Sequence, residues 1–373
     1  MQIGKLVQEG AITIKTGPFG TQLKAAEYQE TGIPVLNVKN LGYGTVNSAK
    51  LDHVGADTVE RLRIHLLQQG DIVFGRKGAV DRHAYIDNES DGWMQGSDCI
   101  RLRVETDDIN PRFLSYYFLT NQHKAFMISM CSHGTTMASL NQKILEQIDF
   151  PCLERNYQDK IVEILSKIDE KGRVNQKINE NLAQQAQAIY ADIFITNADP
   201  AWPLGHLSDL ITVRYGKDHK KLADGPFPVY GSGGVMRYVE RPIYEKESVL
   251  IPRKGTLNNV MYVNEPFWSV DTMFFTEMKL PDVAKFVFHF VKSKDLASLN
   301  AGSAVPSMTT DILNAMELCI PDQETLKCFE SIVGPMYRAM QHNTEESKKL
   351  ATVRDTLLPR LMSGELDVSK LDL

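Results

Sequence analysis

The sequence has few cysteines and no long apolar run. Its five cysteines, at positions 99, 131, 152, 319 and 328, are an odd number, lie far apart and form no C-x-x-C pair. This pattern argues against a disulfide framework and against a zinc site. The first ten residues lack the basic start and apolar run of a signal peptide, and no run of about 18 apolar residues follows. We therefore expect a cytoplasmic protein that makes no membrane contact.

Signature motifs of common enzymes are also missing. The chain has no G-x-x-x-x-G-K-[ST] phosphate loop, no H-E-x-x-H pair and no G-x-S-x-G nucleophile elbow. The segment G-S-G-G at 231–234 is typical of a turn that needs positive φ. The segment D-P-A-W at 199–202 lacks the second proline of the amino-methyltransferase loop, and no glycine-rich AdoMet motif precedes it. We expect no catalytic residue, no metal and no cofactor bound by this chain.

The composition is that of an ordinary folded protein with one locally basic region. The chain has 373 residues, of which 43% are hydrophobic and 24% charged, and its net charge is −6. This length allows two or three domains. Between residues 212 and 262, however, nine Lys or Arg residues stand against five Asp or Glu residues. A nucleic-acid binder is identified by such local charge rather than by net charge.

Four sequence matches recur in the same order in both halves of the chain. They are I-T-I-K-T-G (12–17) with I-T-V-R-Y-G (211–216), G-I-P-V (32–35) with P-F-P-V (226–229), R-K-G (76–78) with R-K-G (253–255), and two segments that close at Pro151 and Pro321. A tyrosine, Tyr85 or Tyr262, follows seven residues after each R-K-G glycine. The shared order indicates a duplicated chain.

Each half ends in a long helical pattern. Apolar residues recur every three or four positions from about residue 154 to 194 and again from about 322 to 362. At 1.5 Å per residue, each helix would be roughly 60 Å long. Polar residues such as Asn175 and Asn343 interrupt the middle of each apolar stripe, and Pro335 predicts a kink or interruption in the second helix. Because each helix needs a partner, we expect the two to pack on each other.

The rest of the chain reads as short strands and helices. Residues 71–74 and 248–251 resemble strands that enter the R-K-G turns, and residues 111–126 and 281–293 resemble helices. We predict a mixed α/β fold with two duplicated globular domains and two long helices. The predicted boundaries are 1–153 for the first domain, 154–197 for the central helix, 198–321 for the second domain and 322–373 for the distal helix with its tail.

The repeated R-K-G turn suits DNA binding better than catalysis. Arginine can bond guanine O6 and N7, lysine can neutralise a phosphate, and glycine allows the backbone close to a phosphate. After the turn the halves diverge into A-V-D-R-H and T-L-N-N-V, whose polar side chains suit base edges. The shared turn would position the protein, and the variable residues would specify the sequence. For a single copy a solvated hairpin is the better interpretation; two copies at matched positions favour binding.

Other basic, glycine and hydroxyl residues are also candidate DNA contacts. The alternative interpretation is a solvated surface loop, which is the usual role of a charged loop. The candidates are Gly17, Phe19, Gly20, Lys39, Arg76, Lys77, Gly78, Arg82, His83 and Thr135 in the first half, and Arg214, Lys217, Lys220, Lys221, Ser232, Arg253, Lys254, Asn258 and Asn259 in the second.

Several segments resemble the specificity subunits of type I restriction-modification systems. They are T-G-P-F-G-T-Q-L-K (16–24), G-I-P-V-L-N-V-K-N-L (32–41), G-D-I-V-F-G-R-K-G (70–78), N-Q-K-I-L-E-Q-I-D-F-P (141–151), F-P-V-Y-G-S-G-G-V (227–235) and L-L-P-R-L-M-S-G-E-L (357–366). The resemblance covers nearly the whole chain. The second half departs from it, with Y-G-K-D-H in place of G-P-F-G, so the contacts assigned to 17–20 do not transfer.

The resemblance implies a non-catalytic subunit with two target recognition domains, each reading half of a split, asymmetric site in double-stranded DNA. The long helices would form an antiparallel coiled coil that acts as a spacer. Two methyltransferase subunits that carry AdoMet would methylate adenine, and motor-nuclease subunits would add restriction. The alternative is a scaffold or adaptor that binds proteins and not DNA. Binding to duplex DNA that weakens with salt would separate the two hypotheses.

Overall fold

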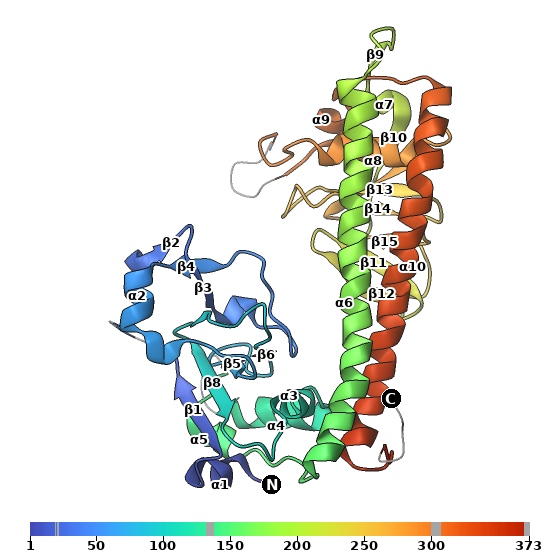
Figure 1. Ribbon diagram of the computed structural model, residues 1–373. Coiled ribbons are helices and arrows are strands. Elements are labelled where there is room, and N and C mark those ends of the chain that lie inside the picture. Colours follow the sequence, from blue (N-terminus) through green and yellow to red (C-terminus); the bar gives the residue numbers. More distant parts are fainter. Residues whose placement is uncertain (19, 21, 132–137, 300–306, 369–373) are drawn as a thin grey trace. The chain divides into compact units, whose positions relative to one another are not determined.

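The computed structural model describes residues 1–18, 20, 22–131, 138–299 and 307–368 (Figure 1). The chain forms two compact units. Unit 1 comprises Met1–Arg173 with Glu346–Leu373, and unit 2 comprises Val174–Glu345. Across the described ranges, no helix is long and apolar enough to cross a membrane.

Unit 1 contains short helices and two small sheets. Its helices are α1 (Ile3–Gln8), α2 (Ala56–Arg61), α3 (Pro111–Tyr117), α4 (Asn121–Cys131) and α5 (Gln142–Glu146), and its strands are β1 (Ile12–Thr16), β2 (Tyr28–Gln29), β3 (Ile33–Leu36), β4 (Asp52–Val54), β5 (Ile72–Gly75), β6 (His83–Tyr85), β7 (Met94–Gln95) and β8 (Cys99–Val104). Single 3₁₀ turns lie at Ala25–Glu27, Val38–Asn40 and Arg63–His65.

Unit 2 is built in the same way. Its short helices are α7 (Leu207–Leu210), α8 (Ala284–Lys292) and α9 (Thr310–Asn314), and its strands are β9 (Leu204–His206), β10 (Ile211–Tyr215), β11 (Phe227–Gly231), β12 (Gly234–Val239), β13 (Ser248–Pro252), β14 (Met261–Val263), β15 (Trp268–Ser269), β16 (Met273–Met278) and β17 (Glu317–Cys319). The long helices are α6 (Arg155–Ala191), which continues into a π turn at Asp192–Thr196, and α10 (Gln323–Met362).

The two units share one sheet topology. The main sheet of unit 1 has the order β1-β8-β5-β6, and that of unit 2 has the order β10-β16-β13-β14. Each unit also has a second sheet, of four strands in unit 1 and three in unit 2, in which one strand pair is parallel, β3 with β7 and β11 with β15. The predicted mixed α/β fold and its duplication are therefore confirmed.

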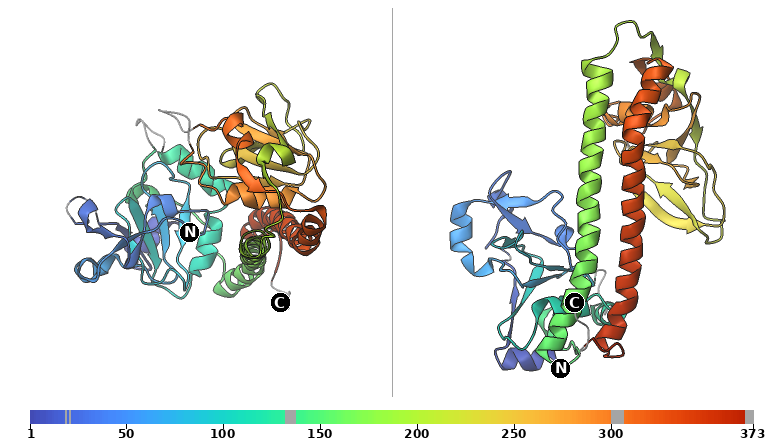
Figure 2. Two further views of the ribbon diagram at one scale, coloured as in Figure 1. Left: turned by 90° about the horizontal axis from the view of Figure 1, so that it is seen from above. Right: turned by 45° about the vertical axis from the view of Figure 1, so that its right-hand side comes forward.

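The long helices run antiparallel within each unit (Figure 2). In unit 1, Lys171 of α6 lies 3.4 Å from the Glu346 carboxylate of α10. In unit 2, the Asn343 side chain of α10 donates to the Asn179 side chain of α6 at 2.9 Å, and Asn179 donates to the Met340 carbonyl at 3.0 Å. The predicted pairing of the helices is confirmed. The polar residues in the middle of each stripe contact one another across the pair.

Two details of the helices differ from the prediction. Helix α10 continues through Pro335 without a break. An interior proline removes one backbone donor and crowds the preceding turn of the helix, but the buried neighbours Phe329 and Val333 hold this part of the helix in the core of unit 2. Residues 111–126 form two helices instead of one. They separate near Thr120, whose hydroxyl donates to the Tyr117 carbonyl and accepts from the amide of the following helix.

Each globular part and its helix segments share one core. In unit 1, Phe74 and Ile100 of the main sheet and Phe113 of α3 are buried in one cluster with Leu165 of α6 and Leu361 of α10. Burial of such side chains stabilises each by about 1.5–3 kcal/mol. The helix segments are thus an integral part of the unit that carries the R-K-G turn.

Candidate nucleic-acid interface

The first R-K-G turn follows β5 and is held by backbone hydrogen bonds on both sides. The Arg76 amide donates to the Asp98 carbonyl at 2.8 Å, and the Leu140 amide donates to the Arg76 carbonyl at 2.8 Å. Lys77 and Ser139 form an isolated antiparallel bridge. The turn therefore lies between the start of β8 and the segment that leads to α5.

The second R-K-G turn follows β13 and makes the equivalent contacts. The Arg253 amide donates to the Thr272 carbonyl at 2.9 Å, and the Met308 amide donates to the Arg253 carbonyl at 2.9 Å. Lys254 and Ser307 form the matching antiparallel bridge. The sequence repeat is therefore also a repeat of backbone geometry.

The tips of both turns are open. Gly78 and Gly255 have φ values of +75° and +88°, which favour glycine. Lys77 and Lys254 are both exposed. Lys77 lies 3.9 Å from the Asp98 carboxylate, an exposed pair that contributes little to stability. Each turn thus presents a cation and a glycine backbone to the solvent, as phosphate binding requires.

The glycine that follows β1 and the glycine that follows β10 are both buried. A Cβ atom on Gly17 would lie 2.0 Å from the Gly96 carbonyl oxygen, and one on Gly216 would lie 2.0 Å from the Val270 carbonyl oxygen. Gly17 therefore allows two backbone segments to approach each other. Its assignment as a phosphate contact is corrected on this ground.

An exposed aromatic ring lies beside the second turn. The guanidinium of Arg253 is 5.3 Å from the ring centroid of Tyr215, which is 51% exposed at the end of β10. The next loop is fixed because the Trp268 indole N–H donates to the Lys217 carbonyl at 2.9 Å. Lys220 and Lys221 are exposed further along this loop. Lys217, Lys220 and Lys221, three of the predicted DNA contacts, therefore follow the end of β10, which lies beside the second turn.

Arg214, also on β10, has a different environment from those loop lysines. Its guanidinium lies 3.1 Å from the Glu277 carboxylate of the neighbouring strand β16. This partner holds Arg214 on the sheet and raises the pKa of its guanidinium.

The two asparagines after the second turn have different roles. The Asn259 side chain donates to the Ser232 carbonyl at 2.7 Å and so ties the β11–β12 turn to the R-K-G turn. The Asn258 side chain donates to the Asp295 carboxylate at 3.0 Å and accepts from the Ala297 amide at 3.0 Å. Both polar ends of Asn258 hold the loop after α8, and the residue is also exposed, so its role in base reading stays a prediction.

In unit 1 a polar and aromatic cluster follows the turn. The Tyr43 hydroxyl donates to the Asp81 carboxylate at 2.7 Å, and this hydrogen bond raises the pKa of Tyr43. Arg82 and Lys124 lie 5.6 and 4.7 Å from the centre of the Tyr43 ring, which is 43% exposed. Exposed aromatic rings with neighbouring cations suit stacking and phosphate contacts. The sequence prediction identified Arg82 but missed Tyr43 and Lys124.

His83 is fully buried and cannot touch a base in this structure. Its Nε2 lies 2.9 Å from the Ser115 hydroxyl, and its ring packs against Phe74 and Phe118. Burial lowers the pKa of His83 to about 3, so the ring is neutral at physiological pH. The prediction that His83 contacts DNA is wrong for this reason.

Of the remaining candidates in unit 1, the structure describes Lys39 and Gly20. Lys39 is exposed and lies 2.8 Å from the Asp52 carboxylate, and Gly20 is exposed with a φ of +66°. Phe19 and Thr135 lie outside the described residues. Within those residues, no group of three His, Cys, Asp or Glu side chains could hold a metal ion.

Residues 11–184 and 201–346 match the family described as the type I restriction modification DNA specificity domain. The chain belongs to this family. It is therefore a DNA-specificity component rather than an enzyme. Each matched region of this specificity protein contains one R-K-G turn.

Curated relatives and one solved structure resemble the specificity protein over nearly its whole length. It is 20% identical to the type I restriction enzyme MjaIX specificity subunit of Methanocaldococcus jannaschii, covering 93% of this chain and 90% of the relative. It is 19% identical to the HindI specificity subunit of Haemophilus influenzae, covering 88% and 94%. The crystal structure of the type I restriction-modification S subunit from M. genitalium matches with a TM-score of 0.59 at 18% identity, covering 99% and 96%. This structural likeness shows the fold.

Proposed function

We propose that this chain is the DNA-recognition subunit of a type I restriction-modification complex and that each unit reads one half of a bipartite, asymmetric target. The observation that carries the proposal is the duplicated turn. Two R-K-G segments, 177 positions apart, are held by equivalent backbone hydrogen bonds and each present an exposed lysine. The domain division at 1–153, 154–197, 198–321 and 322–373 belongs to the same proposal.

The chemistry around the turns differs between the units, which supports an asymmetric target. Lys77 and Lys254 would bind phosphates in both halves because they are exposed point charges. Beyond them, unit 1 offers Tyr43 with Arg82, whereas unit 2 offers Tyr215 with Arg253 and the Asn259-linked turn. Different side chains behind one common turn would select different bases.

The proposed partners follow from the family and from the relatives' names as specificity subunits of type I restriction enzymes. Two methyltransferase subunits carrying AdoMet would methylate adenine, and motor-nuclease subunits would add restriction. This chain would bind no cofactor itself. The long helix pair would act as the spacer between the two half-sites.

Methylome sequencing tests the proposal. Cells that express the chain with its methyltransferase partner should carry adenine methylation at a two-part sequence, and cells that lack only this chain should lose it. Methylation that persists unchanged without the chain would refute the proposal. A lack of salt-sensitive binding to duplex DNA would favour the scaffold hypothesis, because phosphate contacts release counterions and protein contacts need not.

A further inference from the structure

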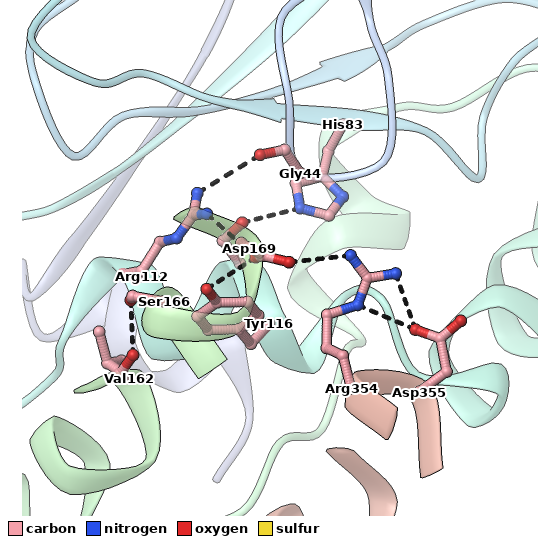
Figure 3. Close-up of polar contacts among 10 residues, drawn as sticks. Gly44, His83, Arg112, Tyr116, Val162, Ser166, Asp169, Arg354 and Asp355 are labelled. Carbon is pink, nitrogen blue, oxygen red and sulfur yellow. Dashed lines mark hydrogen bonds and ion pairs between the residues drawn. The ribbon is translucent and has the colours of Figure 1, made fainter. Parts of the chain in front are cut away.

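One arginine in unit 1 joins the region around the first turn to the long helices (Figure 3). The Arg112 side chain, on α3, donates to the Gly44 carbonyl at 3.3 Å and lies 3.5 Å from the Asp169 carboxylate of α6. Its guanidinium is 4.6 Å from the centre of the Tyr85 ring and 4.8 Å from that of Tyr116. Tyr85 ends the strand that follows the turn, and Gly44 follows the exposed Tyr43.

Asp169 links this arginine to both long helices. One carboxylate oxygen of Asp169 accepts from the Tyr116 hydroxyl of α3 at 2.8 Å. The other accepts from Arg354 of α10 at 3.0 Å. All of these residues belong to unit 1. A single carboxylate therefore fixes α3 to α6 and α10 through directional, charge-assisted hydrogen bonds.

Unit 2 has the same connection with different side chains. Lys285 of α8 is 3% exposed, and its ammonium lies 5.0 Å from the centre of the Tyr262 ring. It lies 2.8 Å from the Glu330 carboxylate of α10 and 3.2 Å from the Glu247 carboxylate. Tyr262 holds the same position after the second turn as Tyr85 holds after the first. In both units a cation thus joins this tyrosine to an acid on a long helix.

A second contact repeats one helical turn after each cation. In unit 1 the Tyr116 hydroxyl donates to the Asp169 carboxylate of α6 at 2.8 Å. In unit 2 the His289 ring nitrogen lies 3.0 Å from the Tyr337 hydroxyl of α10. The connection is therefore kept in both halves, although neither equivalent position carries the same side chain in the two units.

We infer that Arg112 with Asp169, and Lys285 with Glu330, are positioning residues that fix the orientation of each R-K-G turn on the long helices. Ion pairs of this kind contribute little net stability compared with apolar packing, but their geometry is directional. A charged connection repeated in both halves is better explained by orientation than by stability. The inference rests on the proposed function. These residues would keep the spacing between the half-sites strict and would not select the bases.

The test uses the full complex in cells that carry a plasmid library. Each plasmid holds the two wild-type half-sites separated by a spacer that varies one base pair at a time, and methylation is scored by sequencing. Arg112→Gln should lower the preference for the native spacer over its neighbours from at least about tenfold to about twofold, with unchanged half-site bases. Arg112→Lys should retain the preference, because a lysine occupies the equivalent position in unit 2.

The controls separate positioning from stability and from the proposed function. Asp355→Ala removes a partner of Arg354 without touching Asp169, so spacer preference should stay at the wild-type level. If Arg112→Gln does not fold, Asp169→Asn keeps the side-chain shape and decides the question. Lower methylation at an unchanged spacer preference would overturn the inference while leaving the proposed function intact. An absence of chain-dependent methylation in the wild type would overturn both.

Discussion

The exposed lysine of the second turn allows the most quantitative prediction. Lys254→Ala should remove one phosphate contact and leave the turn in place, because the Lys254 amide donates to Thr272 and its backbone bridges to Ser307. Arg253 is a less suitable target, since its side chain also stacks on Tyr215 and donates to a backbone carbonyl.

The expected size of the effect follows from counterion release. One phosphate contact on duplex DNA changes the slope of log K against log salt by about 0.9. Loss of that contact should therefore weaken binding about 15-fold at 50 mM salt and about fivefold at 150 mM salt. The second value corresponds to about 1 kcal/mol. Lys77→Ala should have a smaller effect, because the Asp98 carboxylate already lies 3.9 Å from the Lys77 ammonium.

Fluorescence anisotropy of the assembled complex on a labelled duplex measures both quantities. The titration is repeated between 50 and 300 mM salt, on a duplex with the target sequence found by methylome sequencing and on a random duplex of the same length. The exposed Lys327 of α10 provides the control, and Lys327→Ala should match the wild type. If Lys254→Ala weakens binding by the same factor at every salt concentration, or affects only the target duplex, the assignment of Lys254 to a phosphate is refuted.

Three further predictions concern stability. Gly216→Ala should lower the free energy of unfolding by about 2–3 kcal/mol, because its Cβ would lie 2.0 Å from a carbonyl oxygen. In the control Gly233→Ala the new Cβ meets no atom within 4 Å, so this variant should be nearly neutral in thermal unfolding. Burial lowers the pKa of His123 to about 3 from 6.5, so its contribution is present above pH 6.5 and is lost as the pH falls. His123→Phe should therefore reduce the loss of stability between pH 7.5 and 5 by about 2 kcal/mol, while the exposed His342→Gln should not; equal losses in both variants would contradict this. Asn258→Ala should lower the free energy of unfolding by about 1–2 kcal/mol without changing the methylated sequence, and a changed sequence would instead support the predicted role of Asn258 in base reading.

The sequence predicted the duplication and the long helices because both leave regular signals. An apolar stripe of period 3.6 and four matches in one order depend only on neighbouring residues or on comparison of the two halves. The continuous α10 shows the limit of a local rule: Pro335 predicts an interruption, but buried neighbours such as Phe329 keep the helix intact.

The contacts of single site residues could not be predicted because their partners lie far away in the sequence. The residues around His83 gave no sign that its ring would pack against Phe74 and Phe118. The Asp295 carboxylate that accepts from Asn258 is 37 residues away, and the Asp81 carboxylate that accepts from Tyr43 is 38 residues away. The sequence showed which residue types suit DNA contact, but it did not show which of these side chains contact other residues of the protein.

The central claim is that each unit reads its own half of the target. Its most direct test is methylome sequencing of two single variants, Arg82→Ala in unit 1 and Asn259→Ala in unit 2, beside the wild type. Each variant should relax or change bases in one half-site only, in opposite halves, and leave the other half-site and the spacer as in the wild type. If either variant alters both half-sites, or if both alter the same one, the assignment of one half-site to each unit is contradicted.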